Sequence, residues 1–246
     1  MPRSAYMLFA ALVALAASAA IAQTYPARPV RIVVPFAAGS ATDIMARILA
    51  EDLRGALGQS FVIDNKPGAS AQIGAELVAR APADGYTLFV TTNTSHSANP
   101  FLFKKLAYDP IRDFTPIANI MRIPVIVVVG AKQPLNTLAE LVAQAKASPG
   151  KLSFGYGNSV GQVVGAAFAR RTGIEVITVP YKSTPQAITD VLSGQISYAV
   201  ADLASGQSFV RDGRIKALAV SSARRSTLMP DLAAMAETAG LEGFDL

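Results

Sequence analysis

The chain has 246 residues, of which 51% are hydrophobic and 16% charged, and its formal net charge is +5. This composition excludes a disordered chain, and the length suits two domains of about 100 residues each. A single histidine and the absence of cysteine exclude an ordinary zinc site, a disulfide framework and thiol chemistry. The lysines and arginines are scattered, so no nucleic-acid partner is expected, and the mild positive charge favours small acidic molecules.

The first 22 residues have the pattern of a secretory signal peptide. Arg3 precedes an apolar run from Tyr6 to Ala20, and Ala20-Ile21-Ala22 is a cleavage site of the A-x-A type. The run is too short and wrongly flanked for a membrane-spanning helix. We therefore expect export to a bacterial periplasm or its equivalent, with cleavage after Ala22.

The mature chain opens with a strand, a loop of small residues and a helix. Residues 30–34 are mostly β-branched, which is typical of a strand buried on both faces. Gly39 leaves room for a ligand to approach the backbone. Ser40 and Asp43 have the spacing of a helix-capping box, and apolar residues recur at helical spacing over 44–57. The free N–H groups of such a helix start form an anion site.

Strands and helices alternate along the rest of the chain. The pattern predicts strands over 61–63, 86–91, 124–129, 152–156, 175–179, 196–201 and 215–220, and helices over 73–78, 137–146, 164–172 and 185–192. The strand–loop–helix opening recurs in the second half, so the sequence predicts an α/β fold with two similar lobes facing a cleft. We expect residues 23–120 to form lobe one and residues 121–222 to form lobe two, each with a mainly parallel sheet.

Two enzyme motifs overlap in the second strand–loop–helix unit, over residues 155–161. Gly155, Gly157 and Gly161 resemble a dinucleotide fingerprint, but the acidic Glu175 begins the next strand instead of ending it. The same segment matches G-x-S-x-G, the nucleophile elbow of α/β hydrolases, with Ser159 as the nucleophile. The only histidine, His96, precedes Ser159, which is the wrong chain order for that triad. Binding without catalysis is the main expectation, and an exported hydrolase using Ser159 is the alternative.

Several segments, taken together and in order, resemble the Bug-type extracytoplasmic solute receptors, the substrate-binding proteins of tripartite tricarboxylate transporters. The resemblance runs from about Tyr25 to the last residue. It rests on PFAAGSATDIMARILAEDL, NKPGASAQIGAELVARAPADGYTLFV, YDPIRDFTPIA, ASPGKLSFGYGNSVG, VPYKS and RIKALAVSSARRSTLMPDLAAMAETAG. It implies a two-lobed periplasmic-binding-protein (Venus-flytrap) fold and a monomer that delivers a small carboxylate to the membrane components of a transporter. No cofactor and no metal ion is implied.

The resemblance also implies where the ligand binds. Receptors of this family hold carboxylates mainly through backbone N–H groups, small hydroxyls and waters. The residues of this chain that fit such a site are Ala38, Gly39, Ser40, Thr94, Ser95, His96, Asn158, Ser159 and Val160. Lys182, Ser183 and Asp202 follow later strands and could close the cleft. Asp43 is expected to cap its helix, because a carboxylate there would repel an anion.

The end of the chain carries a separate expectation, since the family normally continues for several tens of residues beyond the position of Leu246. Residues 223–246 are expected to return towards lobe one, incompletely, with a helix over Asp231–Thr238 that docks on that lobe. An exposed apolar patch is then expected around Ile32, Val34 and the first helix. A truncated, non-functional receptor fragment is the second alternative.

Overall fold

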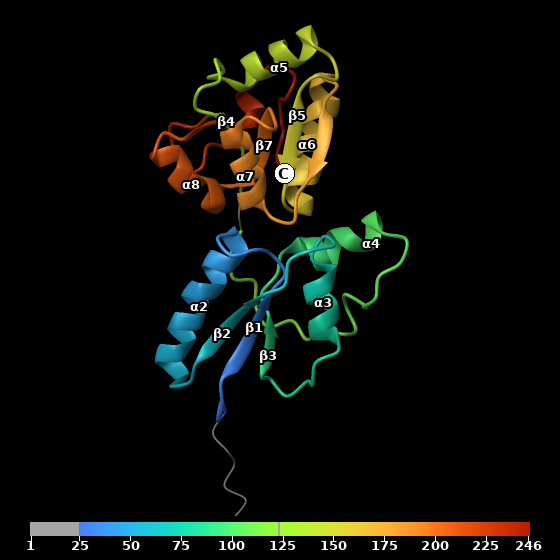
Figure 1. Ribbon diagram of the computed structural model, residues 1–246, viewed down its shortest axis with the longest axis vertical. Coiled ribbons are helices and arrows are strands. Elements are labelled where there is room, and N and C mark those ends of the chain that lie inside the picture. Colours follow the sequence, from blue (N-terminus) through green and yellow to red (C-terminus); the bar gives the residue numbers. More distant parts are fainter. Residues whose placement is uncertain (1–24, 123) are drawn as a thin grey trace, which may run out of the picture.

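A computed structural model describes residues 25–122 and 124–246, and these form two α/β lobes (Figure 1). The predicted signal peptide lies outside the described residues. Lobe one contains a three-stranded parallel sheet in the order β2-β1-β3. Its strands are β1 (Val30–Val34), β2 (Phe61–Asn65) and β3 (Thr87–Phe89), and its helices are α2 (Ala41–Leu57), α3 (Gln72–Ala79) and α4 (Asn99–Leu102).

Lobe two contains a five-stranded sheet in the order β6-β5-β7-β4-β8. Its strands are β4 (Val125–Gly130), β5 (Ser153–Tyr156), β6 (Ile177–Pro180), β7 (Tyr198–Asp202) and β8 (Ile215–Val220). Its helices are α5 (Leu138–Ala147), α6 (Ser159–Thr172), α7 (Thr184–Ser193) and α8 (Leu203–Arg211). Strand β5 runs parallel to β6 and β7, whereas β4 runs antiparallel to β7 and β8. The sheet of lobe one is thus wholly parallel, and that of lobe two is mixed.

The predicted buried strand and capped helix at the start of lobe one are confirmed. Central strand β1 has four of its five residues fully buried. The Ser40 hydroxyl accepts a hydrogen bond from the Asp43 amide at 3.2 Å, and the left-handed Gly58 ends α2. In α5, Thr137 and Glu140 form a complete capping box. Local sequence therefore determines where these helices begin.

The loop before α3 contains consecutive non-glycine residues with positive φ. Ala69, Ser70 and Ala71 have φ angles of 46°, 51° and 69°. The left-handed region brings Cβ close to the following carbonyl oxygen, which costs about 1–2 kcal/mol per residue. The turn before α3 is therefore strained.

Replacing Ala69 with glycine is expected to raise the free energy of unfolding by about 0.5–1 kcal/mol, because relief of the steric cost exceeds the added entropy of the unfolded chain. Ala69 is exposed, so the change removes little packing. The matched control is Ala143→Gly, at an exposed position in the interior of α5, which should lower stability by about 1 kcal/mol. Urea unfolding measures both, and a loss of stability in Ala69→Gly would contradict the strain argument.

Three helical segments lie where the sequence predicted no element. They are α4, α8 and a π-helix over Thr94–Ala98. The π-helix and α8 follow the carboxyl ends of β3 and β7, where a ligand is expected.

The chain end differs from the prediction in structure and in place. The predicted helix over Asp231–Thr238 is wrong: the segment contains only a 3-10 turn over Met235–Glu237. The Val220 amide donates to the Ala233 carbonyl at 2.9 Å, so this backbone pairs with the end of β8 instead of coiling. Met235, Leu241 and Phe244 are buried in a core cluster of lobe two. The chain end thus packs against the core of lobe two, whereas the prediction placed it on lobe one.

The exposed apolar surface of lobe one matches the prediction only in part. Ile32 and Val34 are fully buried, so an exposed patch around them is wrong. On α2, however, Ile44, Ile48 and Leu57 are exposed, as expected for the first helix. Among the described residues, no helix has both the length and the apolar character needed to cross a membrane.

Candidate binding site between the lobes

Four helices begin near the boundary between the lobes. In Figure 1 the upper end of α2 in lobe one lies beneath α7 and α8 of lobe two. Helix α2 contacts α8, and a Cβ built on Gly39 would lie 4.0 Å from Cγ of Pro185, at the start of α7. Helix α6 contacts the π-helix of lobe one. Because helix N-termini carry partial positive charge and unpaired N–H groups, this boundary favours anions.

Two hydroxyl groups join the lobes directly. Thr94 Oγ1 and Ser159 Oγ lie 2.8 Å apart, and the Ser159 amide donates to Thr94 Oγ1 at 3.4 Å. Both residues are buried. The structure therefore brings together two predicted site residues that are 65 positions apart in the chain.

Ser95 and His96 form a small network within lobe one. Ser95 Oγ lies 2.8 Å from Thr91 Oγ1 and 2.8 Å from His96 Nδ1. The imidazole packs edge-on against Phe114 with 4.6 Å between ring centroids. Burial lowers the pKa of His96 below its usual value, so the ring is neutral at physiological pH. His96 is thus anchored by an aromatic neighbour and a serine, and carries no charge towards an anion.

In lobe two, Asp202 joins the starts of α6, α7 and α8. It precedes α8, and its carboxylate accepts hydrogen bonds from Thr184 Oγ1 at 2.7 Å and from Asn158 Nδ2 at 2.9 and 3.2 Å. Asn158 Oδ1 in turn caps α6 by accepting from the Gly161 amide at 2.9 Å. Burial raises the pKa of Asp202, and the hydrogen bonds from Thr184 and Asn158 offset part of that rise. These contacts give Asp202 a role in holding helix starts together.

The remaining lobe-two candidates differ in exposure. Ser183 precedes α7 and is fully buried, and its hydroxyl has no hydrogen-bond partner among the described residues. Val160 is half-buried in the first turn of α6, and Lys182 is exposed. Gly157 lies against the start of α7, because a Cβ built on it would lie 1.9 Å from the Thr184 amide nitrogen.

In lobe one, the candidates Ala38, Gly39 and Ser40 belong to the β1–α2 loop, which we define as residues 36–40. Ala38 and Gly39 are exposed, whereas Ser40 is buried as the helix cap. The Gly39 amide donates to Asp43 Oδ2 at 2.9 Å, so this N–H group already has a partner in the protein. Of the first-turn amides of α2, that of Asp43 donates to Ser40 Oγ, and those of Ala41 and Thr42 have no acceptor within the helix.

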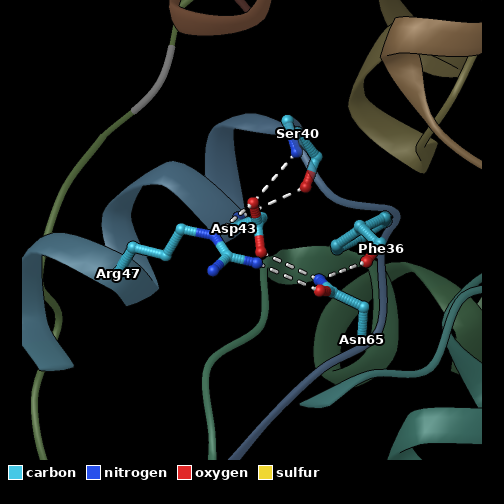
Figure 2. Close-up of polar contacts among 6 residues, drawn as sticks. Phe36, Ser40, Asp43, Arg47 and Asn65 are labelled. Carbon is cyan, nitrogen blue, oxygen red and sulfur yellow. Dashed lines mark hydrogen bonds and ion pairs between the residues drawn. The ribbon is translucent and has the colours of Figure 1, made fainter. Parts of the chain in front are cut away.

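Figure 2 shows that Asp43 also binds residues outside the loop. Its carboxylate accepts from Arg47 Nε and from Asn65 Nδ2, both at 3.0 Å. Burial raises the pKa of Asp43, but the hydrogen bonds from Arg47, Gly39 and Asn65 outweigh it, and the net pKa lies below the usual value. Asp43 is thus an ionised carboxylate at the start of α2. The predicted Ser40–Asp43 capping box is only half formed, because the Asp43 carboxylate accepts from the Gly39 amide and the Ser40 amide donates to the Ala37 carbonyl. Asn65 and Thr184 are polar residues of this region that the sequence analysis did not single out.

The structure also places the residues of the two enzyme motifs found in the sequence. Ser159 follows β5 and opens α6, as in a nucleophile elbow, but its hydroxyl is bonded to Thr94, and His96 is bonded to Ser95. Glu175 precedes β6, at the end of the sheet opposite to the glycine loop, because β5 and β6 are parallel. A ribose-binding acid would lie at the other end of that strand. Within residues 25–122 and 124–246, no group of three or more histidine, cysteine or acidic residues is placed to hold a metal ion.

A family model and a curated relative point to the same family for this chain. Residues 45–245 match the family model described as tripartite tricarboxylate transporter family receptor. Protein BugT of Bordetella pertussis is 36% identical over 220 residues, which cover 88% of this chain and 67% of BugT.

Two solved structures show the same fold. R. palustris Rpa4515 with adipate has a TM-score of 0.87 and 36% identity, over 90% of this chain and 75% of that chain. MatC from Rhodopseudomonas palustris with bound malate has a TM-score of 0.82 and 32% identity, over 90% of this chain and 76% of that chain.

Proposed function

Because the chain belongs to the tripartite tricarboxylate transporter receptor family, we propose that it binds a small carboxylate between its lobes and delivers it to the membrane components of such a transporter. The bound adipate and malate of two related structures support a carboxylate as the ligand. The receptor family and the predicted signal peptide support a periplasmic location, with cleavage after Ala22.

The observation that carries this proposal is the convergence of helix starts at the lobe boundary. The starts of α2 and α7 come together at Gly39 and Pro185, and the start of α6 contacts lobe one through Ser159 and Thr94. Each charge-assisted hydrogen bond to a carboxylate contributes roughly 1.5–3 kcal/mol. Four or five of them reach the roughly 8 kcal/mol of micromolar binding. An arginine clamp is therefore not required.

The ligand contacts we propose are donors at the boundary. They are the amides of Ala41 and Thr42 in the first turn of α2, the hydroxyls of Thr94 and Ser159, and the unpartnered hydroxyl of Ser183. The direct Thr94–Ser159 contact is replaced in this scheme by contacts through the ligand. Asn158 and Asp202 hold the helix starts in place, and Lys182 provides an exposed positive charge nearby.

We further propose that the protein binds its ligand without catalysis. A serine nucleophile needs a general base at hydrogen-bond distance. The neighbour of the Ser159 hydroxyl is another hydroxyl, and the imidazole of His96 is engaged by Ser95.

Thermal unfolding and calorimetric titration of the exported protein test the proposal. The panel contains adipate, malate, mono- and tricarboxylates, and the uncharged diamide of adipic acid as a control. A cognate acid at 100 times its dissociation constant should add about 2.7 kcal/mol of stability, whereas the diamide should add nothing. Failure of all the acids, or equal binding of the diamide, would contradict the proposal.

Ser159→Ala separates the receptor from the hydrolase. We expect the variant to bind the cognate acid about tenfold more weakly, because one hydrogen bond to an ionised group is lost. The control, Ser193→Ala, removes an exposed hydroxyl at the far end of α7 and should leave affinity unchanged. Ester hydrolysis by the parent protein that disappears in Ser159→Ala would favour the hydrolase instead.

A further inference from the structure

Asn65 ties the β1–α2 loop to the sheet of lobe one. It is the last residue of β2 and lies in register with Val34, the last residue of β1. Its Nδ2 group donates to the Phe36 carbonyl and to Asp43 Oδ1, both at 3.0 Å. One side-chain amide therefore contacts the chain where the loop begins and again just after the loop has entered α2 (Figure 2).

Asp43 connects the same loop to α2. Its Oδ2 atom accepts from the Gly39 amide at 2.9 Å and from Arg47 Nε at 3.0 Å, while its Oδ1 atom accepts from Asn65. The Asp43 side chain is only 3% exposed, whereas that of Arg47 is 54% exposed. The buried carboxylate thus holds one amide of the loop, that of Gly39, by a hydrogen bond.

We propose that Asn65 and Asp43 are positioning residues that fix the β1–α2 loop in its ligand-binding conformation. With the Gly39 amide held by Asp43, Ala38 and the first-turn amides of α2 are presented at the boundary. A loop that is already ordered loses less conformational freedom on binding, and this raises affinity without any new ligand contact. The inference rests on the proposed function, because it assigns these residues a role in carboxylate binding.

Two isosteric substitutions test this role. Asn65→Asp keeps the shape but replaces the amide donor with a carboxylate beside Asp43. Asp43→Asn keeps the shape and removes the negative charge of the carboxylate to which Gly39, Arg47 and Asn65 donate hydrogen bonds. The matched controls are Asn136→Asp, before α5, and Asp52→Asn, on the exposed surface of α2. Calorimetric titration with adipate and malate measures affinity, and NMR hydrogen exchange of the Gly39 amide measures how the loop is held.

Both positioning variants should bind about 10- to 100-fold more weakly, the factor expected from one hydrogen bond to a charged group. Exchange of the Gly39 amide should accelerate at least tenfold, and both controls should stay within twofold of the parent. Unchanged affinity in Asn65→Asp and Asp43→Asn would overturn the proposal even if Gly39 exchange changes. If the parent binds neither adipate nor malate, the titrations use the acid of the wider panel that binds, and if none binds, the proposed function has failed. Gly39 exchange alone then decides, and an unchanged exchange rate in both variants overturns the positioning role.

Discussion

Replacing Gly157 with alanine is expected to lower the free energy of unfolding by about 3 kcal/mol or more, at the upper end of overpacking effects, and to abolish carboxylate binding. The added Cβ would lie 1.9 Å from the Thr184 amide nitrogen and 2.1 Å from the Ser183 carbonyl carbon. Both atoms are backbone, so no side-chain rotation relieves the clash. The starts of α6 and α7 must separate, and they form half of the proposed site. Urea unfolding and titration with adipate and malate measure the two effects.

The control for this prediction is the same kind of substitution in an unobstructed helix. A Cβ on Gly55, in the exposed part of α2, would meet nothing within 4 Å. Gly55→Ala should therefore raise stability by about 1 kcal/mol through helix propensity and leave affinity unchanged. If Gly157→Ala were as stable as the parent and bound ligand equally well, the packing of α6 against α7 would not be as described.

Asp202→Ala is the second change with a large expected effect. Removal of the carboxylate leaves the buried Thr184 hydroxyl and the Asn158 amide without their acceptor. Breaking such a buried network should cost about 2–4 kcal/mol of stability. Affinity should also fall, because Asn158 caps α6 and Thr184 opens α7.

The control for Asp202→Ala is Asp212→Ala, at the exposed end of α8, which should change stability by less than about 0.5 kcal/mol. Chemical denaturation and ligand titration of both variants provide the measurement. Equal stability of Asp202→Ala and the parent would show that Asp202 does not hold the helix starts together.

Local signals were sufficient to predict the first strand and the first helix of lobe one. The β-branched run of β1, the Ser40 cap and the apolar spacing of α2 each act over a few residues, so they can be read without a partner. Helix α8 has no such signal, because Ser205, Gly206 and Ser208 are poor helix formers. Its position depends on tertiary packing: a Cβ on Gly206 would lie 3.0 Å from Cδ1 of Ile126 in β4.

The structure of the chain end also depends on tertiary contacts that the local sequence does not indicate. Leu232 and Met235 have a spacing that suits a helix, but the edge of β8 provides an unpaired strand end, and the Val220 amide pairs with Ala233. A backbone partner that is distant in sequence thus overrides a local periodic pattern. This competition can be recognised only once the sheet order is known.

For the site, the sequence suggested small polar residues after strands as candidates. The fold brings Thr94 to Ser159 and Asn158 to Asp202, and that these residues bind the ligand stays a prediction. The sequence did not indicate that the Gly39 amide donates to Asp43, or that Asn65 donates to both Asp43 and the Phe36 carbonyl. These contacts depend on the register of β1 with β2, which aligns Val34 with Asn65.

The central claim, that helix starts at the lobe boundary bind a carboxylate, is tested most directly by a crystal structure of the protein with adipate or malate. We expect carboxylate oxygens within hydrogen-bond distance of amides in the first turn of α2, with contacts to the Ser159 or Thr94 hydroxyl. A separate open pocket of about 550 Å³ lies beside α4 and is lined by Lys104 and Lys105. Binding of the acid in that pocket, with the lobe boundary empty, would contradict the account.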